Sequence, residues 1–129
     1  MTMYLALKTD QAEAELYLLA SDGEIAKQKI WLADRELARD LPGEIDALLG
    51  GKYEELKGII VFKGPGSFTG LRIGAAVANA IAYAQQINIV GTTGDEWRAG
   101  GVRRLREGDN DKIILPTYGA RPHITSAKK

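Results

Sequence analysis

The hydrophobic and polar positions at the start of the chain predict a sheet of three short strands. Apolar residues dominate residues 4–8, 13–20 and 24–31, and the Asp22-Gly23 dipeptide between the last two is typical of a hairpin turn. Leu16 and Leu18 stand among other apolar residues, so both faces of the second strand are expected to be covered. The pattern therefore indicates an antiparallel meander.

The pattern then changes to helical spacing and back. Residues 33–49 carry Leu37, Leu41 and Ile45 on one side of a helix, for which Asp34 is the expected N-cap. Residues 59–62 are continuously apolar, as in a strand buried on both faces, and residues 87–90 predict a last strand after a second helix. This order implies parallel crossovers. The expected fold class is α/β: one mixed five-stranded sheet, with strands 1–3 antiparallel, strands 4 and 5 parallel, and helices packed on it.

A glycine-rich stretch joins the fourth strand to the second helix, which is predicted over residues 70–85. Residues 64–74 are Gly-Pro-Gly-Ser-Phe-Thr-Gly-Leu-Arg-Ile-Gly, with Ser67 or Thr69 as N-cap. Small residues recur at every fourth position of the helix, namely Gly70, Gly74, Ala78 and Ala82. An adjacent stripe is apolar: Ile73, Val77 and Ile81. Periodicity alone favours close packing of the small stripe inside the fold. The alternative is a docking face for a partner helix.

Composition narrows the chemistry that the chain can perform. A length of 129 residues suits one domain, and 17 basic against 17 acidic side chains leave no net charge to attract nucleic acid. There is no cysteine and His123 is the only histidine, which excludes disulfides and thiolate or histidine-cluster metal sites. Ser67 has no histidine within its motif, so a serine hydrolase is not expected. No apolar run reaches the length of a membrane span, and a cytoplasmic protein is expected.

The stretch from Gly64 to Gly74 resembles the signature of the TsaB (YeaZ) family, the companion subunit in bacterial threonylcarbamoyladenosine modification of tRNA. The similarity also covers the opening strands, Leu41-Pro42, the fourth strand and the segment up to Thr93. It resumes at residues 115–118, which look like the Leu-Pro-x-Tyr of the family's C-terminal tail. The family's second actin-like lobe has no counterpart between these segments. The resemblance therefore implies a shortened form with a single ribonuclease-H-like (actin-like) lobe.

The resemblance also implies a subunit that is not itself a catalyst. The family's subunit binds the paralogous transferase TsaD through its first two helices, and isolated members pair with themselves. The implied partners are a TsaD-like transferase, a TsaE-like ATPase and, in isolation, a second copy, with no cofactor. This favours the docking interpretation of the small stripe. The residues expected at the partner interface are Leu37, Leu41, Phe68, Gly70, Leu71, Gly74, Ala75, Ala78 and Ala82.

The end of the first strand departs from the family's pattern. The family usually has Asp-Thr-Ser there, whereas this chain has Lys8-Thr9-Asp10. A lysine repels a metal ion, so no metal site is expected, and Asp10 is interpreted as a turn residue. A single lobe offers only one wall of the nucleotide cleft, so no ATPase activity is expected. A phosphate- or nucleotide-binding module at the Gly64–Gly70 turn stays an alternative, because a glycine-rich turn before a helix can hold an anion.

The remaining sequence is expected to replace the second lobe. Residues 1–94 are predicted to form the lobe, and residues 95–129 an arginine-rich helix or linker with a C-terminal tail. Four arginines, Arg98, Arg103, Arg104 and Arg106, fall within nine residues. They form either a solvated face or a contact with tRNA phosphates, which is expected to be indirect or weak.

Overall fold

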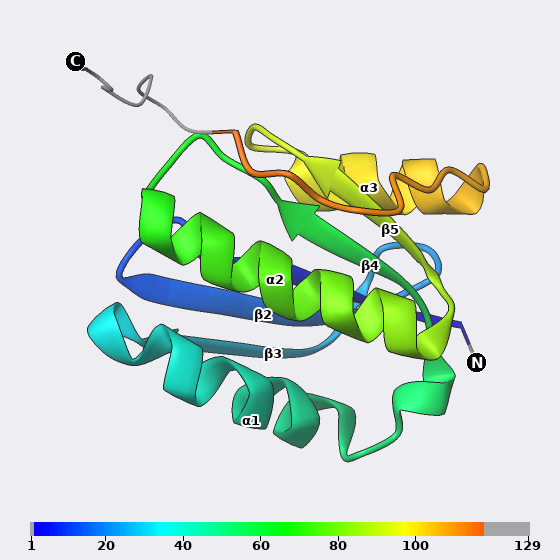
Figure 1. Ribbon diagram of the computed structural model, residues 1–129. Coiled ribbons are helices and arrows are strands. Elements are labelled where there is room, and N and C mark those ends of the chain that lie inside the picture. Colours follow the sequence, from blue (N-terminus) through cyan, green and yellow to red (C-terminus); the bar gives the residue numbers. More distant parts are fainter. Residues whose placement is uncertain (1, 118–129) are drawn as a thin grey trace.

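A five-stranded sheet in the order β3-β2-β1-β4-β5 forms the centre of the computed structural model, which describes residues 2–117 (Figure 1). β2 pairs antiparallel with β1 and β3, whereas β4 pairs parallel with β1 and β5. The strands are β1 (Met3–Lys8), β2 (Glu13–Ala20), β3 (Ile25–Leu32), β4 (Leu56–Phe62) and β5 (Asn88–Thr92). The predicted mixed sheet is confirmed.

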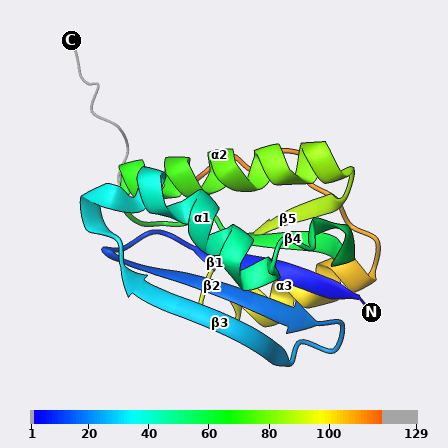
Figure 2. The same ribbon diagram turned by 90° about the horizontal axis from the view of Figure 1, so that it is seen from below.

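Helices cover both faces of this sheet (Figures 1 and 2). The helices are α1 (Leu37–Leu49), α2 (Phe68–Gln85) and α3 (Trp97–Arg106), with 3-10 turns at Asp34–Glu36 and Tyr53–Glu55. α1 and α2 lie next to each other on one face, and α3 covers the other. Within residues 2–117 no helix is long and apolar enough to cross a membrane. The cytoplasmic location stays a prediction.

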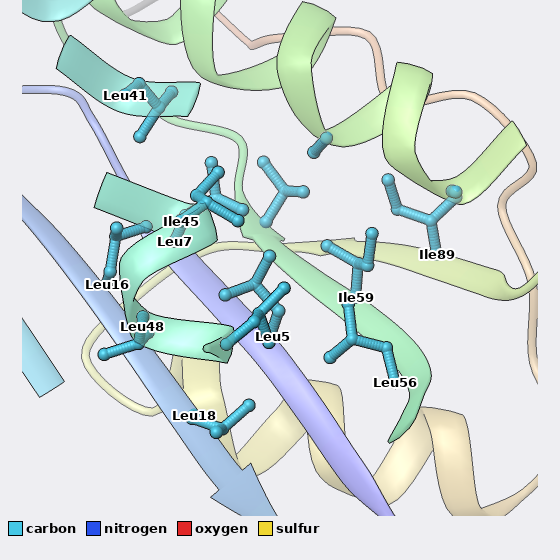
Figure 3. Packing of buried hydrophobic residues seen from close by; sticks show 14 of the residues in the cluster. Leu5, Leu7, Leu16, Leu18, Leu41, Ile45, Leu48, Leu56, Ile59 and Ile89 are labelled. Carbon is cyan, nitrogen blue, oxygen red and sulfur yellow. The ribbon is translucent and has the colours of Figure 1, made fainter. Parts of the chain in front are cut away.

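The alternation of side chains along β1 divides them between two hydrophobic cores. Leu5 and Leu7 lie in the core beneath α1 and α2, together with Leu41 and Ile45 of α1 (Figure 3). The side chains between them belong to a second core, which includes Trp97 of α3. Alternate side chains of β1 thus enter different cores, as expected for a strand that helices cover on both faces. The sheet is therefore a middle layer between two helical layers.

β2 is buried on both faces, as its sequence predicts. Leu16 and Leu18 belong to the core beneath α1 and α2, whereas Tyr17 and Leu19 belong to the core beneath α3. Successive side chains of a strand point to opposite faces, so this strand needs apolar residues at both its odd-numbered and its even-numbered positions. β2 thus serves as an internal strand of the sheet.

The first helix begins later than predicted. Asp34 lies in a 3-10 turn with φ +46°, and α1 has Glu36 at its N-cap without a side-chain capping bond. The backbone N–H groups of Ala33 and Asp34 both donate to the carbonyl oxygen of Ala12, over 2.9 and 3.0 Å. This tertiary contact holds the chain outside helical geometry, so the prediction of Asp34 as N-cap is wrong.

The segment after α3 seals the outer edge of β5. The N–H of Ile89 donates to the Asn110 side chain over 3.0 Å, and the carbonyl of Ile89 accepts the N–H of Asp111 over 2.7 Å. The N–H of Gly91 donates to the Asp111 carboxylate over 2.8 Å, and its carbonyl accepts Arg104 over 3.0 Å. We call residues 108–117 the strap (orange in Figure 1). The strap and Arg104 thus satisfy backbone groups of β5 that a sixth strand would otherwise pair with.

Candidate functional site

The glycine-rich turn after β4 is packed against the end of β1. The N–H of Ser67 donates to the carbonyl oxygen of Asp10 over 3.1 Å, and the Thr9 hydroxyl donates to the carbonyl oxygen of Gly70 over 2.8 Å. A Cβ added at Gly66 would lie 2.4 Å from the Cβ of Asp10, and one at Gly70 would lie 2.1 Å from the Thr9 carbonyl oxygen. The motif therefore lets α2 start in close contact with β1.

This packing fills the glycine surfaces that a phosphate would use. A Cβ added at Gly64 would lie 2.0 Å from the carbonyl oxygen of Thr117, whose N–H donates to the Lys63 carbonyl over 2.6 Å. Oxygen atoms of Thr9, Asp10 and Thr117 thus face the turn, and oxygen acceptors repel an anion. The contacts favour a packing role for the turn over the phosphate-binding alternative.

Lys8 and Asp10 form an ion pair at the end of β1. Their charged atoms are 2.7 Å apart, and the two side chains are 19% and 7% exposed. The Lys8 ammonium also lies 4.6 Å from the centre of the Phe62 ring. Asp10 is therefore a buried partner of Lys8 and more than the turn residue that was predicted. Among residues 2–117, no group of three or more His, Cys, Asp or Glu side chains is placed to hold a metal ion, and His123 lies outside the described residues.

The predicted partner interface falls mostly inside the chain's own core. Ala78 is fully buried, and a Cβ added at Gly74 would lie 2.2 Å from the Thr9 hydroxyl oxygen. The buried members of the predicted set are Leu37, Leu41, Leu71, Gly74, Ala75, Ala78 and Ala82. The small stripe expected to dock a partner helix is instead packed within the chain's own fold, where Gly70 and Gly74 lie against Thr9 just after β1. Phe68, which is 48% exposed, remains at the surface, and Gly70 is half-buried.

The exposed side of α2 carries another stripe of small residues, which the sequence analysis missed. Ala76, Ala80 and Ala84 are exposed and spaced four residues apart. The flank between this stripe and the core is half-buried and apolar: Ile73, Val77 and Ile81. Both stripes consist of small residues spaced four apart, so the spacing alone does not show which of them is buried.

The side of α1 that lies next to α2 can be inferred from an ion pair on the opposite side of α1. Glu44 pairs with Lys29 of β3 at 3.8 Å, so that flank of α1 faces β3. Ala38 and Pro42 are exposed on the other flank. We define the α1/α2 outer face by its exposed residues Ala38, Pro42, Ala76, Ala80 and Ala84.

Arg98, one of the four predicted tRNA-contacting arginines, is engaged within the fold. Its guanidinium lies 4.2 Å from the centre of the Tyr17 ring. The Tyr17 hydroxyl donates to the Glu15 carboxylate over 2.6 Å. Burial, followed by the bond to Glu15, raises the pKa of Tyr17 to about 12, although Arg98 opposes the shift. Arg104 also binds within the fold, to the Gly91 carbonyl of β5 and the Asp111 carboxylate of the strap.

Arg103 and Arg106 are exposed beside a groove between α3 and the β2–β3 turn. The groove holds about 740 Å³, and its charged lining residues are Arg98, Arg103, Arg106, Asp22, Asp95, Glu96 and Glu107. The acids balance the arginines locally, so the groove offers no strong positive field. Contact with tRNA stays a prediction that the structure does not strengthen.

Comparison with known proteins gives the family. The family model described as TsaD, tRNA N6-adenosine threonylcarbamoyltransferase, matches residues 31–99, more than half of the chain. The chain belongs to this family. It is 32% identical over 120 residues to the tRNA threonylcarbamoyladenosine biosynthesis protein TsaB of Bacillus subtilis, a match that covers 91% of this chain and 50% of TsaB. A tRNA N6-adenosine threonylcarbamoyltransferase of Geobacter metallireducens is 30% identical over 96 residues, covering 72% of this chain and 28% of that protein.

Solved structures agree with this TsaD-family assignment. YeaZ from Pseudomonas aeruginosa superposes with a TM-score of 0.67 at 27% identity, covering 84% of this chain and 50% of YeaZ. The Lmo2764 protein of Listeria monocytogenes superposes with a TM-score of 0.51 at 11% identity, which shows a shared fold only. The ribonuclease-H-like, actin-like fold class and the homology to TsaB (YeaZ) are thus confirmed. The chain spans about half the length of TsaB and YeaZ.

Proposed function

We propose that this chain is a non-catalytic subunit that binds a TsaD-like transferase in threonylcarbamoyladenosine modification of tRNA. The similarity to TsaB over 91% of the chain carries the proposal. The name of that relative assigns it to threonylcarbamoyladenosine biosynthesis, and the second curated match is a transferase of the same pathway. A TsaE-like ATPase stays a prediction from the family resemblance.

The α1/α2 outer face is the proposed docking surface. Its exposed alanines would let a foreign helix approach the backbone of α2 closely, while half-buried Ile73 and Val77 would supply apolar contact. The buried stripe of Gly70 to Ala82 would act indirectly, by setting the position of α2 against β1. The proposed contact therefore involves the two helices that the sequence predicted, α1 and α2, but lies on their outer sides.

The absence of catalysis in this subunit is supported by the end of β1. Lys8 pairs with the Asp10 carboxylate at 2.7 Å, at the end of the central strand β1. A carboxylate already paired with a lysine is a poor ligand for a metal ion that would hold a phosphate. We therefore assign any transferase chemistry to the partner.

Replacing Ala80 by arginine tests the docking surface. Co-purification of the chain with its cognate TsaD-like transferase should show at least a tenfold loss of affinity, about 1.4 kcal/mol, because a long charged side chain would separate the helices. Ala99→Arg is the matched control, since Ala99 is an exposed helical alanine on α3, across the sheet. Equal affinity for wild type, Ala80→Arg and Ala99→Arg would contradict the proposed face, and no complex with the wild-type chain would contradict the function.

A further inference from the structure

The two edge strands of the sheet, β5 and β3, differ in whether their outer backbone groups have hydrogen-bond partners. The strap and Arg104 of α3 satisfy the outer N–H and C=O groups of Ile89 and Gly91 in β5, whereas no segment of residues 2–117 pairs with the outer edge of β3 (Figure 2). β3 also exposes Ile30 and Leu32, which are 44% and 71% accessible. An eight-residue edge strand with exposed apolar side chains is a template for another strand.

The regular part of this open edge is short. The register with β2 shifts between Leu18 and Leu19, which leaves Ala26 as an extra residue and Lys27–Leu32 as the regular segment. Within it, Gln28, Ile30 and Leu32 lie on the α3 side of the sheet, because they pair with alternate residues of β2 from Tyr17 to Glu13. Lys27, Lys29 and Trp31 lie on the side of α1.

Charge restricts how this segment can pair with a second copy of itself. In an antiparallel pair related by a two-fold axis through the sheet, one residue faces its own counterpart. Pairing centred on Lys27 or Lys29 brings two like charges together, and pairing centred on Gln28 places Lys27 opposite Lys29. Centring on Ile30 avoids every such contact and still uses most of the regular segment.

The register centred on Ile30 is also favourable on both faces. On the α3 side, Ile30 meets Ile30 of the second copy, and Leu32 packs beside the aliphatic part of the Gln28 side chain. On the other side, Lys29 stands opposite Trp31, where an ammonium can lie over the indole ring. Of the registers that pair at least five residues of the regular segment, this one alone sets no like charges directly opposite each other.

We propose that two copies of this chain associate through β3, antiparallel and centred on Ile30, to form one continuous ten-stranded sheet. This surface is distinct from the α1/α2 outer face, so it goes beyond the proposed function. It leaves that face of each copy available to another protein.

Cysteine mapping tests the register directly, because the chain contains no cysteine. Ile30→Cys should form a disulfide-linked dimer on mild oxidation of the full chain, since opposed residues lie within the ~7 Å between Cα atoms that a disulfide requires. Gln28→Cys is the matched control and should stay monomeric on a non-reducing gel, since its two copies would be ~13 Å apart. A mixture of Gln28→Cys and Leu32→Cys should cross-link. No cross-link at position 30, or equal cross-linking at 28 and 30, would overturn the proposal.

Sedimentation of a second pair of variants separates this surface from the helical one. Ile30→Lys should weaken the dimer at least tenfold, while Ile113→Lys, at an exposed isoleucine of the strap, should not. A dimer that survives Ile30→Lys but is lost in Ala80→Arg uses the helices and refutes the β3 pairing. Ile30→Lys should still bind the transferase, so the two proposals can fail independently.

Discussion

Gly70 and Gly74 are required because they have no side chain, and not because the backbone there adopts an unusual conformation. Neither has a positive φ, yet a Cβ at either position would lie within 2.2 Å of an oxygen of Thr9. The four-residue spacing correctly predicted that something approaches this side of α2. It could not tell a foreign helix from the chain's own β1, because both need the same small surface.

Gly74→Ala should therefore destabilise the protein although alanine favours helices. The new methyl group displaces Thr9 and its bond to the Gly70 carbonyl, and we expect a loss of about 1–3 kcal/mol in the free energy of unfolding. Gly100→Ala in α3 is the control, because no atom lies within 4 Å of its added Cβ, and it should gain roughly 0.5–1 kcal/mol. Urea unfolding monitored by circular dichroism measures both, and similar values for the two variants would refute the packing role.

At the level of elements, the strap could not be anticipated from its sequence. Residues 108–112 are polar and lack periodicity, and their partners are distant: Asn79 of α2 both donates to and accepts from the backbone of Ile114, 35 residues away. The apolar stripe of α1, in contrast, was predictable, because the burial of a helix repeats along its own sequence. Contacts between segments that are far apart in the sequence produce no such repeat.

The strap should respond to pH through Asp111. Burial alone would raise the pKa of this carboxyl, but bonds from Arg104 and the Gly91 N–H outweigh it and lower the pKa below its usual value. A lowered pKa in the folded state stabilises the protein above the unfolded pKa of about 3.9, and that stability is lost as pH falls through the folded value. Asp111→Asn should thus cost about 1 kcal/mol at pH 7, with the difference shrinking below pH 4.

Thermal or urea unfolding from pH 3 to 7 measures this effect. Glu54→Gln, at an exposed acid in the 3-10 turn before β4, should show no such dependence. A penalty for Asp111→Asn that is constant over the whole range would contradict the ion pair as its cause.

At the scale of the whole molecule, α3 completes the lobe. Trp97, Val102 and Leu105 form part of the second core, and Gly101 lets α3 approach Ile60 of β4 closely. Residues 97–106 are therefore a packed helix, and of the two predicted possibilities the linker is wrong. The division of the chain at residue 94 stays a prediction.

A single cooperative unit should follow from this packing. In a Trp31→Phe variant the remaining tryptophan, Trp97, reports on α3, and its fluorescence should unfold at the same urea concentration as the far-ultraviolet circular dichroism. Trp97→Ala should lower the free energy of unfolding by about 3–5 kcal/mol. An earlier fluorescence transition would show that α3 detaches before the sheet unfolds.

The sequence by itself determined the order of strands and helices, the mixed sheet and the family, because periodicity and a contiguous motif are local properties of the chain. Only the tertiary structure decided which of two evenly spaced small stripes on α2 faces inward, that Lys8 pairs with Asp10, and that one sheet edge is paired while the other is open. These depend on contacts between residues far apart in sequence, and a pattern along one segment does not specify what packs against it.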